Sequence, residues 1–452
     1  MSEAIAAIAT GTELSAIGIV RLSGDGVIEL AQRLFRPADG KPLTGHRDRQ
    51  LIYGRLTDRA GEDLDLCLCT FSHGPNSYTG EDTTEFQCHG SPVLLSALLE
   101  ELGALGARQA LPGEFTKRAF LNGRMDLTEA EAVTDLIDAE SRQAARNALG
   151  QLSGAIGRKI GEIYETLAGI SAHYHAVLDY PDEDIEDFRL RDYRERMESA
   201  RTDLQRLRES YSRGSMLRSG IPTAIIGLPN AGKSSLLNAL VGYERAIVTD
   251  IPGTTRDTIE EKARLGDLSL RLIDTAGIRQ TRDQVERLGV ERSRRALSEA
   301  GLVLAVVDGS LPPSPEEREI LEAAERAPKA LAVLSKGDLP PVRESLETSL
   351  PVISVSAVTG QGLDRLEAAV KALFPLPPVP AGEILTNARQ AGAVARALDS
   401  LDAALEAMAQ GMTPDVVLTE MEEAMEALGE LTGRSVRRDV TEQIFARFCV
   451  GK

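Results

Sequence analysis

A phosphate-binding loop follows a short apolar segment in the middle of the chain. Residues 227–234 read GLPNAGKS, which fits the pattern GxxxxGK[ST], and the apolar run 223–226 before it is typical of a strand. In such a loop successive backbone N–H groups face phosphate oxygens, Lys233 reaches the β- and γ-phosphates, and the Ser234 hydroxyl ligates Mg²⁺. The sequence therefore predicts a P-loop α/β domain that binds a nucleoside triphosphate.

A second motif follows in the order found in GTPases. Residues 270–277 read LRLIDTAG, an apolar strand that ends in DxxG. Asp274 is expected to hold the magnesium shell, and the Gly277 amide is expected to sense the γ-phosphate.

Two later motifs indicate which base is bound. Residues 335–338 read SKGD after the apolar run 331–334, and they resemble the guanine-binding pattern NKxD. The Asp338 carboxylate would accept hydrogen bonds from guanine N1 and N2, a pair of donors that adenine lacks. Ser356-Ala357 follows the next apolar run and resembles the last guanine-contacting element. The order of the motifs predicts GTP as the ligand.

The guanine motif departs from the usual pattern at one position. Ser335 stands where most GTPases have Asn. A hydroxyl is too short to make both contacts of a carboxamide. The departure leaves the strength of guanine binding open, while Asp338 still favours GTP over ATP.

Length and charge limit the architecture and the partners. A chain of 452 residues predicts about three domains at roughly 100 to 200 residues each. The formal net charge is −18. An acidic protein does not bind nucleic acid through its overall charge, so any RNA contact must be local.

The N-terminus and the cysteine content indicate the cellular compartment. The chain begins Met1-Ser2-Glu3 without a basic region, and no apolar run approaches the length of a membrane span. We therefore expect a cytoplasmic protein. Four cysteines are too few for a disulfide framework in a chain of this size. Cys67 and Cys69 alternate with leucines, which favours one buried face of a strand over metal ligation.

Hydrophobic periodicity divides the chain into a multidomain α/β arrangement. Residues 1–120 mix strand-like and helical runs and predict an α+β domain. Helical periodicity dominates residues 121–216, with Thr128 and Glu131 expected to form a capping box, and it resumes over 377–452 after a proline-rich linker. Neither helical segment closes a core alone, so we expect one helical domain built from both, with the GTPase domain of residues 217–376 inserted between them.

Several motifs outside the GTPase domain resemble one known family. They are the segment GPNSYTGED at 74–82, the segment PGEFTKRAFLNGRMDL at 112–127 and the C-terminal Cys449-Val450-Gly451-Lys452. Together with the inserted GTPase they resemble the MnmE (TrmE) family of tRNA-modifying GTPases along the whole chain. The resemblance implies a potassium-activated, homodimeric GTPase that works with an FAD-dependent MnmG-type partner. The pair would install an aminomethyl or carboxymethylaminomethyl group at C5 of the wobble uridine in certain tRNAs.

The resemblance also implies a folate site in the N-terminal domain. That domain would bind 5-formyltetrahydrofolate or a related tetrahydrofolate and mediate dimerisation. The matching positions here are Arg21, Glu85, Arg124 and Lys452. Arg124 stands where the family often has Lys, which keeps the charge but changes the geometry. Cys449 beside this site is expected to be functionally relevant, with its chemistry left open; a buried structural thiol is the alternative.

The resemblance further assigns the ions. A K⁺ cage would be made by Asn230, Thr249, Ile251 and Thr254, and Mg²⁺ would be held by Ser234 and Thr255. The monovalent cation would supply the charge that an arginine finger supplies in other GTPases. The full set of expected GTP contacts is Asn230, Ala231, Gly232, Lys233, Ser234, Ser235, Thr249, Thr254, Thr255, Asp274, Thr275, Ala276, Gly277, Ser335, Lys336, Asp338, Ser356 and Ala357.

The group that orients the attacking water is not in its usual place. Ile278 follows the DTAG motif where a Ras-like enzyme has Gln, and an alkyl chain cannot hydrogen-bond to water. The resemblance points to Glu286 instead, acting through a bridging water. Read alone, Glu286 is one acid in a charged segment. Lys233, Thr255, Asp274 and Glu286 are thus the expected catalytic residues, with Cys449 as a further candidate.

Two other functions remain open at this point. One is a ribosome-assembly GTPase in which the nucleotide regulates RNA docking, although no basic RNA-binding domain is evident. The other is a one-carbon-transfer enzyme with an incidental GTPase domain. The cluster of Arg434, Arg437 and Arg438 is a candidate contact for tRNA or a partner, although such clusters are usually only solvated.

Overall fold

The computed structural model describes residues 2–179, 190–242, 261–266, 268–273, 300–343, 345–375, 380, 382–435, 438–446 and 448–452. The chain divides into two compact units. The first unit comprises residues 1–134, 152–172 and 422–452, and the second comprises residues 135–151 and 173–421. Among the described residues, no helix is both long and apolar enough to cross a bilayer.

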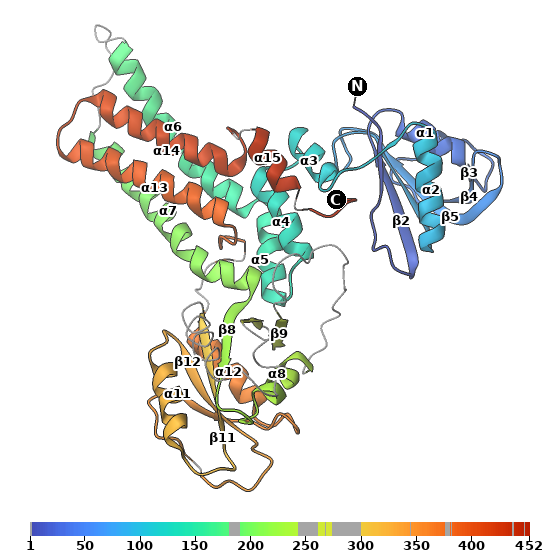
Figure 1. The fold of residues 1–452 in the computed structure, drawn as a ribbon. Coiled ribbons are helices and arrows are strands. Elements are labelled where there is room, and N and C mark those ends of the chain that lie inside the picture. Colours follow the sequence, from blue (N-terminus) through green and yellow to red (C-terminus); the bar gives the residue numbers. More distant parts are fainter. Residues whose placement is uncertain are drawn as a thin grey trace. The chain divides into compact units, whose positions relative to one another are not determined.

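The first unit contains a seven-stranded sheet in the order β3-β4-β5-β6-β2-β1-β7 (Figure 1). Pairing is antiparallel except between β1 and β7. The α+β composition expected for this part of the chain is present. The strands are β1 (Ile5–Ile8), β2 (Ser15–Ser23), β3 (Phe35–Pro37), β4 (Ile52–Thr57), β5 (Asp63–Ser72), β6 (Thr83–Gly90) and β7 (Arg108–Gln109), and the helices are α1 (Val27–Leu34), α2 (Pro92–Ala104) and α3 (Glu114–Leu121), with a 3-10 turn at Leu43–Gly45.

The cysteines of β5 and β6 belong to the core of this sheet. Cys67, Cys69 and Cys88 are buried, whereas Leu66 is exposed, so the predicted alternation along β5 is confirmed. A hydrogen bond with Cys88 and burial both raise the pKa of the Cys67 thiol. Asp65 lies close enough to Cys67 and Cys88 to complete a three-ligand cluster, yet a thiol as hard to ionise as that of Cys67 is a poor metal ligand. We therefore retain the structural reading of these cysteines.

The cap of α4 differs from the predicted one. The helix α4 spans Leu127–Ile137. The Asp126 carboxylate accepts from the Glu129 backbone N–H (2.8 Å), and the Glu129 carboxylate accepts from the Asp126 N–H (2.8 Å). The capping box is thus Asp126 with Glu129, and the prediction of Thr128 with Glu131 was wrong. Asp caps as well as Thr does, and its position two residues earlier lets Leu127 be buried within the first turn.

Helices of both terminal regions meet in the first unit. Leu127 and Ala130 of α4 form a buried cluster with two phenylalanines near the C-terminus, Phe445 and Phe448. This cluster joins residues more than 300 positions apart in the sequence. The other helices that contribute to this unit are α6 (Ala155–Asp179), α14 (Pro414–Thr432) and α15 (Arg438–Phe445).

A helix pair in the second unit joins the segments on either side of the nucleotide domain. Helix α7 (Leu190–Ser219) packs along α13 (Ala388–Ala409), and Arg201 pairs with Asp402 between them. The Ser210 hydroxyl accepts from the Leu385 backbone N–H at 3.1 Å. Helices from both sides of the GTPase domain thus pack together in this pair, whereas one helical domain built from all of residues 121–216 and 377–452 stays a prediction. Helix α5 (Arg142–Leu152) also belongs mostly to this unit.

The nucleotide domain is built on a six-stranded sheet in the order β13-β12-β11-β8-β10-β9. All neighbours are parallel except β9 with β10. The strands are β8 (Ile221–Ile226), β9 (Glu261–Leu265), β10 (Leu268–Leu272), β11 (Leu302–Asp308), β12 (Ala330–Ser335) and β13 (Val352–Ser354), and the helices are α8 (Lys233–Gly242), α11 (Pro315–Glu325) and α12 (Leu363–Leu373).

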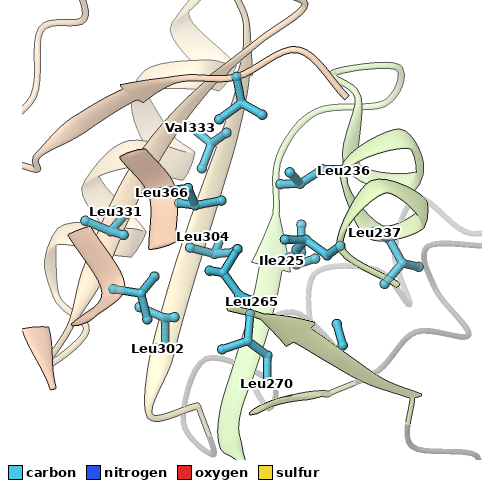
Figure 2. Close-up of a cluster of buried hydrophobic side chains, with 14 of the residues drawn as sticks. Ile225, Leu236, Leu237, Leu265, Leu270, Leu302, Leu304, Leu331, Val333 and Leu366 are labelled. Atoms are coloured by element: carbon cyan, nitrogen blue, oxygen red, sulfur yellow. The ribbon is translucent and has the colours of Figure 1, made fainter. Parts of the chain in front are cut away.

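Leucine-rich packing holds this sheet against its helices. Figure 2 shows Ile225, Leu304 and Val333 of the central strands facing Leu236 and Leu237 of α8 and Leu366 of α12. The central strand β11 is buried at every residue, as expected for a strand of a parallel sheet that is covered on both faces. This packing fixes the carboxyl ends of β8, β11 and β12, from which the predicted nucleotide residues extend.

Candidate functional site

The P-loop connects the end of β8 to the start of α8. Gly227 directly follows β8, and a Cβ added there would lie 2.4 Å from the Val306 carbonyl oxygen of β11. Asn230 and Gly232 adopt left-handed backbone angles, with φ of 63° and 98°. Asn tolerates this region better than most residues, and glycine adopts it without strain. The chain can therefore make the tight turn that directs backbone N–H groups into one concave surface.

The Lys233 ammonium lies inside this loop. It donates to the Gly227 carbonyl at 2.8 Å and to the Leu228 carbonyl at 2.7 Å. Burial lowers the pKa of Lys233. The structure thus holds a desolvated cation at the centre of the loop, which suits an anionic ligand. Ser234 and Ser235, the next two residues, lie exposed on the first turn of α8.

Ser335 connects the guanine motif to the P-loop. Its hydroxyl oxygen lies 2.6 Å from the Ala231 carbonyl oxygen and 3.0 Å from that of Val307. A hydroxyl has one proton to donate, and the shorter distance favours Ala231 as its acceptor. Gly232 permits this approach, because a Cβ there would lie 3.1 Å from the Ser335 oxygen. The Ser335 hydroxyl is too short to make both contacts of a carboxamide, and it instead stabilises the P-loop through the Ala231 carbonyl.

The two elements predicted to bind guanine also meet. The Ser356 hydroxyl donates to the Asp338 carboxylate at 2.7 Å, and Ser356 itself is buried. This hydrogen bond orients one oxygen of the Asp338 carboxylate. Asp338 is exposed, so its carboxylate is still accessible to a ligand. Ala357 follows Ser356 and is half-buried. The structure brings together the residues that were singled out from separate motifs.

Lys336 adopts an unusual backbone conformation beside them. Its φ is 59°, and among the described residues only Arg49 and Asn230 are other non-glycine residues with positive φ. The Lys336 ammonium pairs with Asp308 at the end of β11. Burial raises the pKa of Asp308, but hydrogen bonds from Lys336 and Ser310 outweigh it and hold that pKa below its usual value. This ion pair secures a strained residue in the predicted base-binding loop.

Many residues of the predicted switches and ion sites lie outside the described residues. They are Thr249, Ile251, Thr254, Thr255, Asp274, Thr275, Ala276, Gly277 and Glu286. The described half of the site comprises the P-loop and the base-binding motifs.

A second candidate site lies in the first unit around Arg21. The Arg21 guanidinium donates to the Glu85 carboxylate at 2.7 Å across the β2–β6 pair. It also donates to the Gly451 carbonyl at 3.4 Å and lies 5.8 Å from the ring centres of Tyr78 and Phe115. Two aromatic rings and a fixed cation provide a surface suited to a planar anionic molecule.

The C-terminal residues complete this surface. The Phe115 backbone N–H donates to the Lys452 carbonyl at 3.2 Å, and the Gly113 N–H donates to the Cys449 carbonyl at 3.2 Å. These bonds hold the C-terminal segment against the start of α3. The Cys449 thiol is exposed, so the alternative of a buried structural thiol was wrong. Arg124 lies beside Gly80 of the segment 74–82, since a Cβ added at Gly80 would lie 3.3 Å from the Arg124 Cγ.

Sequence reasoning missed the roles of Tyr78 and Phe115. Both lie within the two motifs 74–82 and 112–127 that were singled out, but nothing in one sequence places them around Arg21. The Tyr78 hydroxyl lies 2.9 Å from the Thr116 hydroxyl, which orients its ring. The presence of an aromatic residue within each motif is the signal that was available.

The predicted basic cluster is only partly described. Arg434 lies over the Tyr164 ring at 4.9 Å and pairs with Glu165 at 3.8 Å. Arg437 and the side chain of Arg438 lie outside the described part of the chain. Because Arg434 has an acidic neighbour, this residue gives no support to an uncompensated basic patch.

Known protein families and relatives match this chain along its length. The family described as the GTP-binding protein TrmE N-terminus matches residues 4–124, and the MnmE helical domain matches residues 127–449. A tRNA modification GTPase MnmE from Symbiobacterium thermophilum is 43% identical and is matched over 100% of this chain and 99% of its own length. Proteins of the same name from Roseiflexus and Geobacillus kaustophilus are also 43% identical over 100% of this chain and 99% of theirs. Among solved structures, the G domain of the T. maritima FeoB iron transporter is 26% identical, covers 33% of this chain and 96% of that chain, and has a TM-score of 0.25.

Proposed function

The chain belongs to the MnmE (TrmE) family of tRNA modification GTPases, and we propose that its GTP hydrolysis drives dimerisation of the GTPase domains and a conformational change that licenses modification of the wobble uridine of certain tRNAs. The chain is a GTP hydrolase by this membership. The modification would add a carboxymethylaminomethyl or aminomethyl group at C5, in concert with an FAD-dependent MnmG-type partner. The observation that carries the proposal is the match along the whole chain, since P-loop domains alone occur in many unrelated proteins.

We propose that the described loop residues bind the nucleotide. Lys233 would exchange its two carbonyl acceptors for the β- and γ-phosphate oxygens, which is favourable because a phosphate offers charge-assisted hydrogen bonds. Asp338, oriented by Ser356, would accept from guanine N1 and N2. Ser335 would keep the loop in the binding conformation through Ala231 rather than by touching the base.

Two ions are assigned to residues of the same site. Mg²⁺ would be held by Ser234 and Thr255, and it would neutralise charge on the β- and γ-phosphates. K⁺ would be held by Asn230 together with Thr249, Ile251 and Thr254. The left-handed backbone of Asn230 in an exposed part of the loop supports its availability as an oxygen ligand. Glu286 would orient the attacking water.

The surface around Arg21 is proposed to bind a tetrahydrofolate. Tyr78 and Phe115 offer faces for a planar ring, and Arg21, Arg124 and Lys452 offer positive charge for its glutamate carboxylates. Glu85, fixed by Arg21, offers an acceptor for ring N–H groups. Cys449 is exposed beside it and is accessible to a bound substrate. Homodimerisation through this N-terminal domain completes the proposal.

Steady-state GTP hydrolysis in potassium and in sodium buffer at equal ionic strength tests the nucleotide half. We expect strong stimulation by potassium, and we expect Asn230→Ala to remove that stimulation while leaving detectable GTP binding. Equal rates in the two buffers would contradict the cation site and favour a GTPase of the ribosome-assembly type. Incubation of the chain with its FAD-dependent partner, a folate donor and unmodified tRNA tests the other half, with modified uridine measured by mass spectrometry.

A further inference from the structure

A cavity of about 300 Å³ lies within the second unit, away from the P-loop. Its walls include Ile221 and Leu268, which begin β8 and β10, and Lys329, which directly precedes β12. These parallel strands carry the nucleotide motifs at their carboxyl ends, so the cavity borders the opposite edge of the sheet. The volume is at the lower end of the range for small-molecule sites.

Most of the lining is apolar, with Met216, Leu268 and Phe374 among its members. Two cations are set into this apolar surface. Arg213 is exposed at the rim on α7, and Lys329 is half-buried with its ammonium 3.7 Å from the centre of the Phe374 ring.

Neither cation is neutralised by a carboxylate within the described part of the chain. No ion pair or hydrogen bond of Arg213 or Lys329 to an acidic side chain is present among the described residues. Glu140, a described acid that directly precedes the lining residue Ser141, instead accepts from Lys262 at 2.6 Å and from Ser269 at 2.7 Å. Burial and the positive charge of Arg213 both lower the pKa of Lys329. An anion that enters the cavity would be attracted by both cations and would reduce the repulsion between them.

We propose that this cavity binds a small amphipathic anion, with an aromatic or aliphatic body among Met216, Leu268 and Phe374 and an acidic head group between Arg213 and Lys329. The body would bury apolar surface, and the head group would relieve the repulsion between the two cations. The site is separate from the nucleotide and folate sites proposed above and does not depend on either.

Binding of 2-naphthoate to the full-length chain, compared with the neutral isostere 2-naphthamide, tests the proposal. Titration calorimetry should give an affinity for the acid about tenfold higher than for the amide, as one charge-assisted hydrogen bond would provide. Lys329→Gln and Arg213→Gln should each abolish most of this difference. Arg208→Gln, an exposed arginine on the same helix, is the matched control and should keep it. Saturating GDP should not displace the acid.

Two results would overturn the assignment. One is equal affinity for the acid and the amide, or no binding of the acid at millimolar concentration. The other is displacement of the acid by GDP, which would place it in the nucleotide site. Met216→Trp fills the cavity without changing its charges, and it should lower the affinity for the acid and for the amide alike. GTP hydrolysis by each variant, measured in parallel, verifies that the domain is folded.

Discussion

The Ser335 hydroxyl donates to the Ala231 carbonyl at 2.6 Å and so joins the end of β12 to the P-loop. Both residues are buried. This contact gives the serine at the usual asparagine position a function that does not involve the base. It also couples the predicted guanine-binding segment to the predicted phosphate-binding loop.

Removing this hydroxyl should weaken nucleotide binding. Ser335→Ala leaves the buried Ala231 carbonyl without its partner, at a cost of about 1–3 kcal/mol. If that cost falls on the binding conformation of the loop, GDP affinity drops roughly tenfold. Binding of a fluorescent GDP analogue measures the effect, with the exposed Ser349→Ala as control. Unchanged affinity in Ser335→Ala would mean that the loop keeps its shape without this hydrogen bond.

Loss of the Lys233 ammonium should have a larger effect. Lys233→Ala removes the one side-chain cation of the P-loop and should abolish measurable binding of GTP and GDP, because no other group in the loop replaces its charge. Lys371→Ala, an exposed lysine of α12, serves as the matched control. The same fluorescence titration distinguishes them, and retained affinity in Lys233→Ala would exclude the predicted phosphate contact.

Glu286 should affect hydrolysis and not binding. Glu286→Ala removes the proposed water-orienting carboxylate, and loss of such a group lowers rates by roughly 10²-fold or more. Glu291→Ala, in the same charged segment, should leave turnover unchanged. Single-turnover hydrolysis with GTP in excess of its dissociation constant measures the chemical step directly. Normal turnover in Glu286→Ala would remove this residue from the mechanism.

The features that could be predicted from the sequence are those that depend on local residue patterns. The P-loop, the order of the GTPase motifs, the buried face of β5 and the pairing of helical segments around the inserted domain all follow from spacing and periodicity. The cap of α4 was misplaced because Asp126 and Thr128 are both good caps, and only tertiary burial of Leu127 chooses between them. The contact of Ser335 with Ala231 spans 104 residues and is not readable from one chain. The arrangement of Tyr78 and Phe115 around Arg21 also depends on contacts between residues that are distant in the sequence.

Replacing Arg21 by lysine should weaken folate binding selectively. Lysine keeps the charge but cannot hold Glu85 and the Gly451 carbonyl with a single planar group. We expect affinity for 5-formyltetrahydrofolate to fall about tenfold. Arg36→Lys, at an exposed position of β3, is the control, and GTP hydrolysis should be unaffected in both variants. Equal folate binding by Arg21→Lys and the unmodified chain would move the ligand away from this surface.

Glu114 at the start of α3 makes the first unit sensitive to acid. Its carboxylate accepts from Arg108 at 2.7 Å, from Arg118 at 3.0 Å and from the Leu111 backbone N–H at 2.8 Å. Burial raises the pKa of Glu114, but these hydrogen bonds outweigh it and lower that pKa from 4.5 to about 2. The folded state therefore binds this proton more weakly than the unfolded state does.

A carboxylate with a depressed folded pKa stabilises the protein above its unfolded pKa, and that contribution is lost as the pH falls through its folded pKa. Glu114 should thus contribute about 3 kcal/mol at pH 7, and the contribution should disappear between pH 4.5 and pH 2. In scanning calorimetry, Glu114→Gln should melt below the unmodified chain at pH 7, and the gap should narrow below pH 4.5. Glu100→Gln, at an exposed position of α2, should show no such gap. A gap that stays constant down to pH 2.5 would mean that Glu114 acts through its shape and hydrogen bonds and not through its charge.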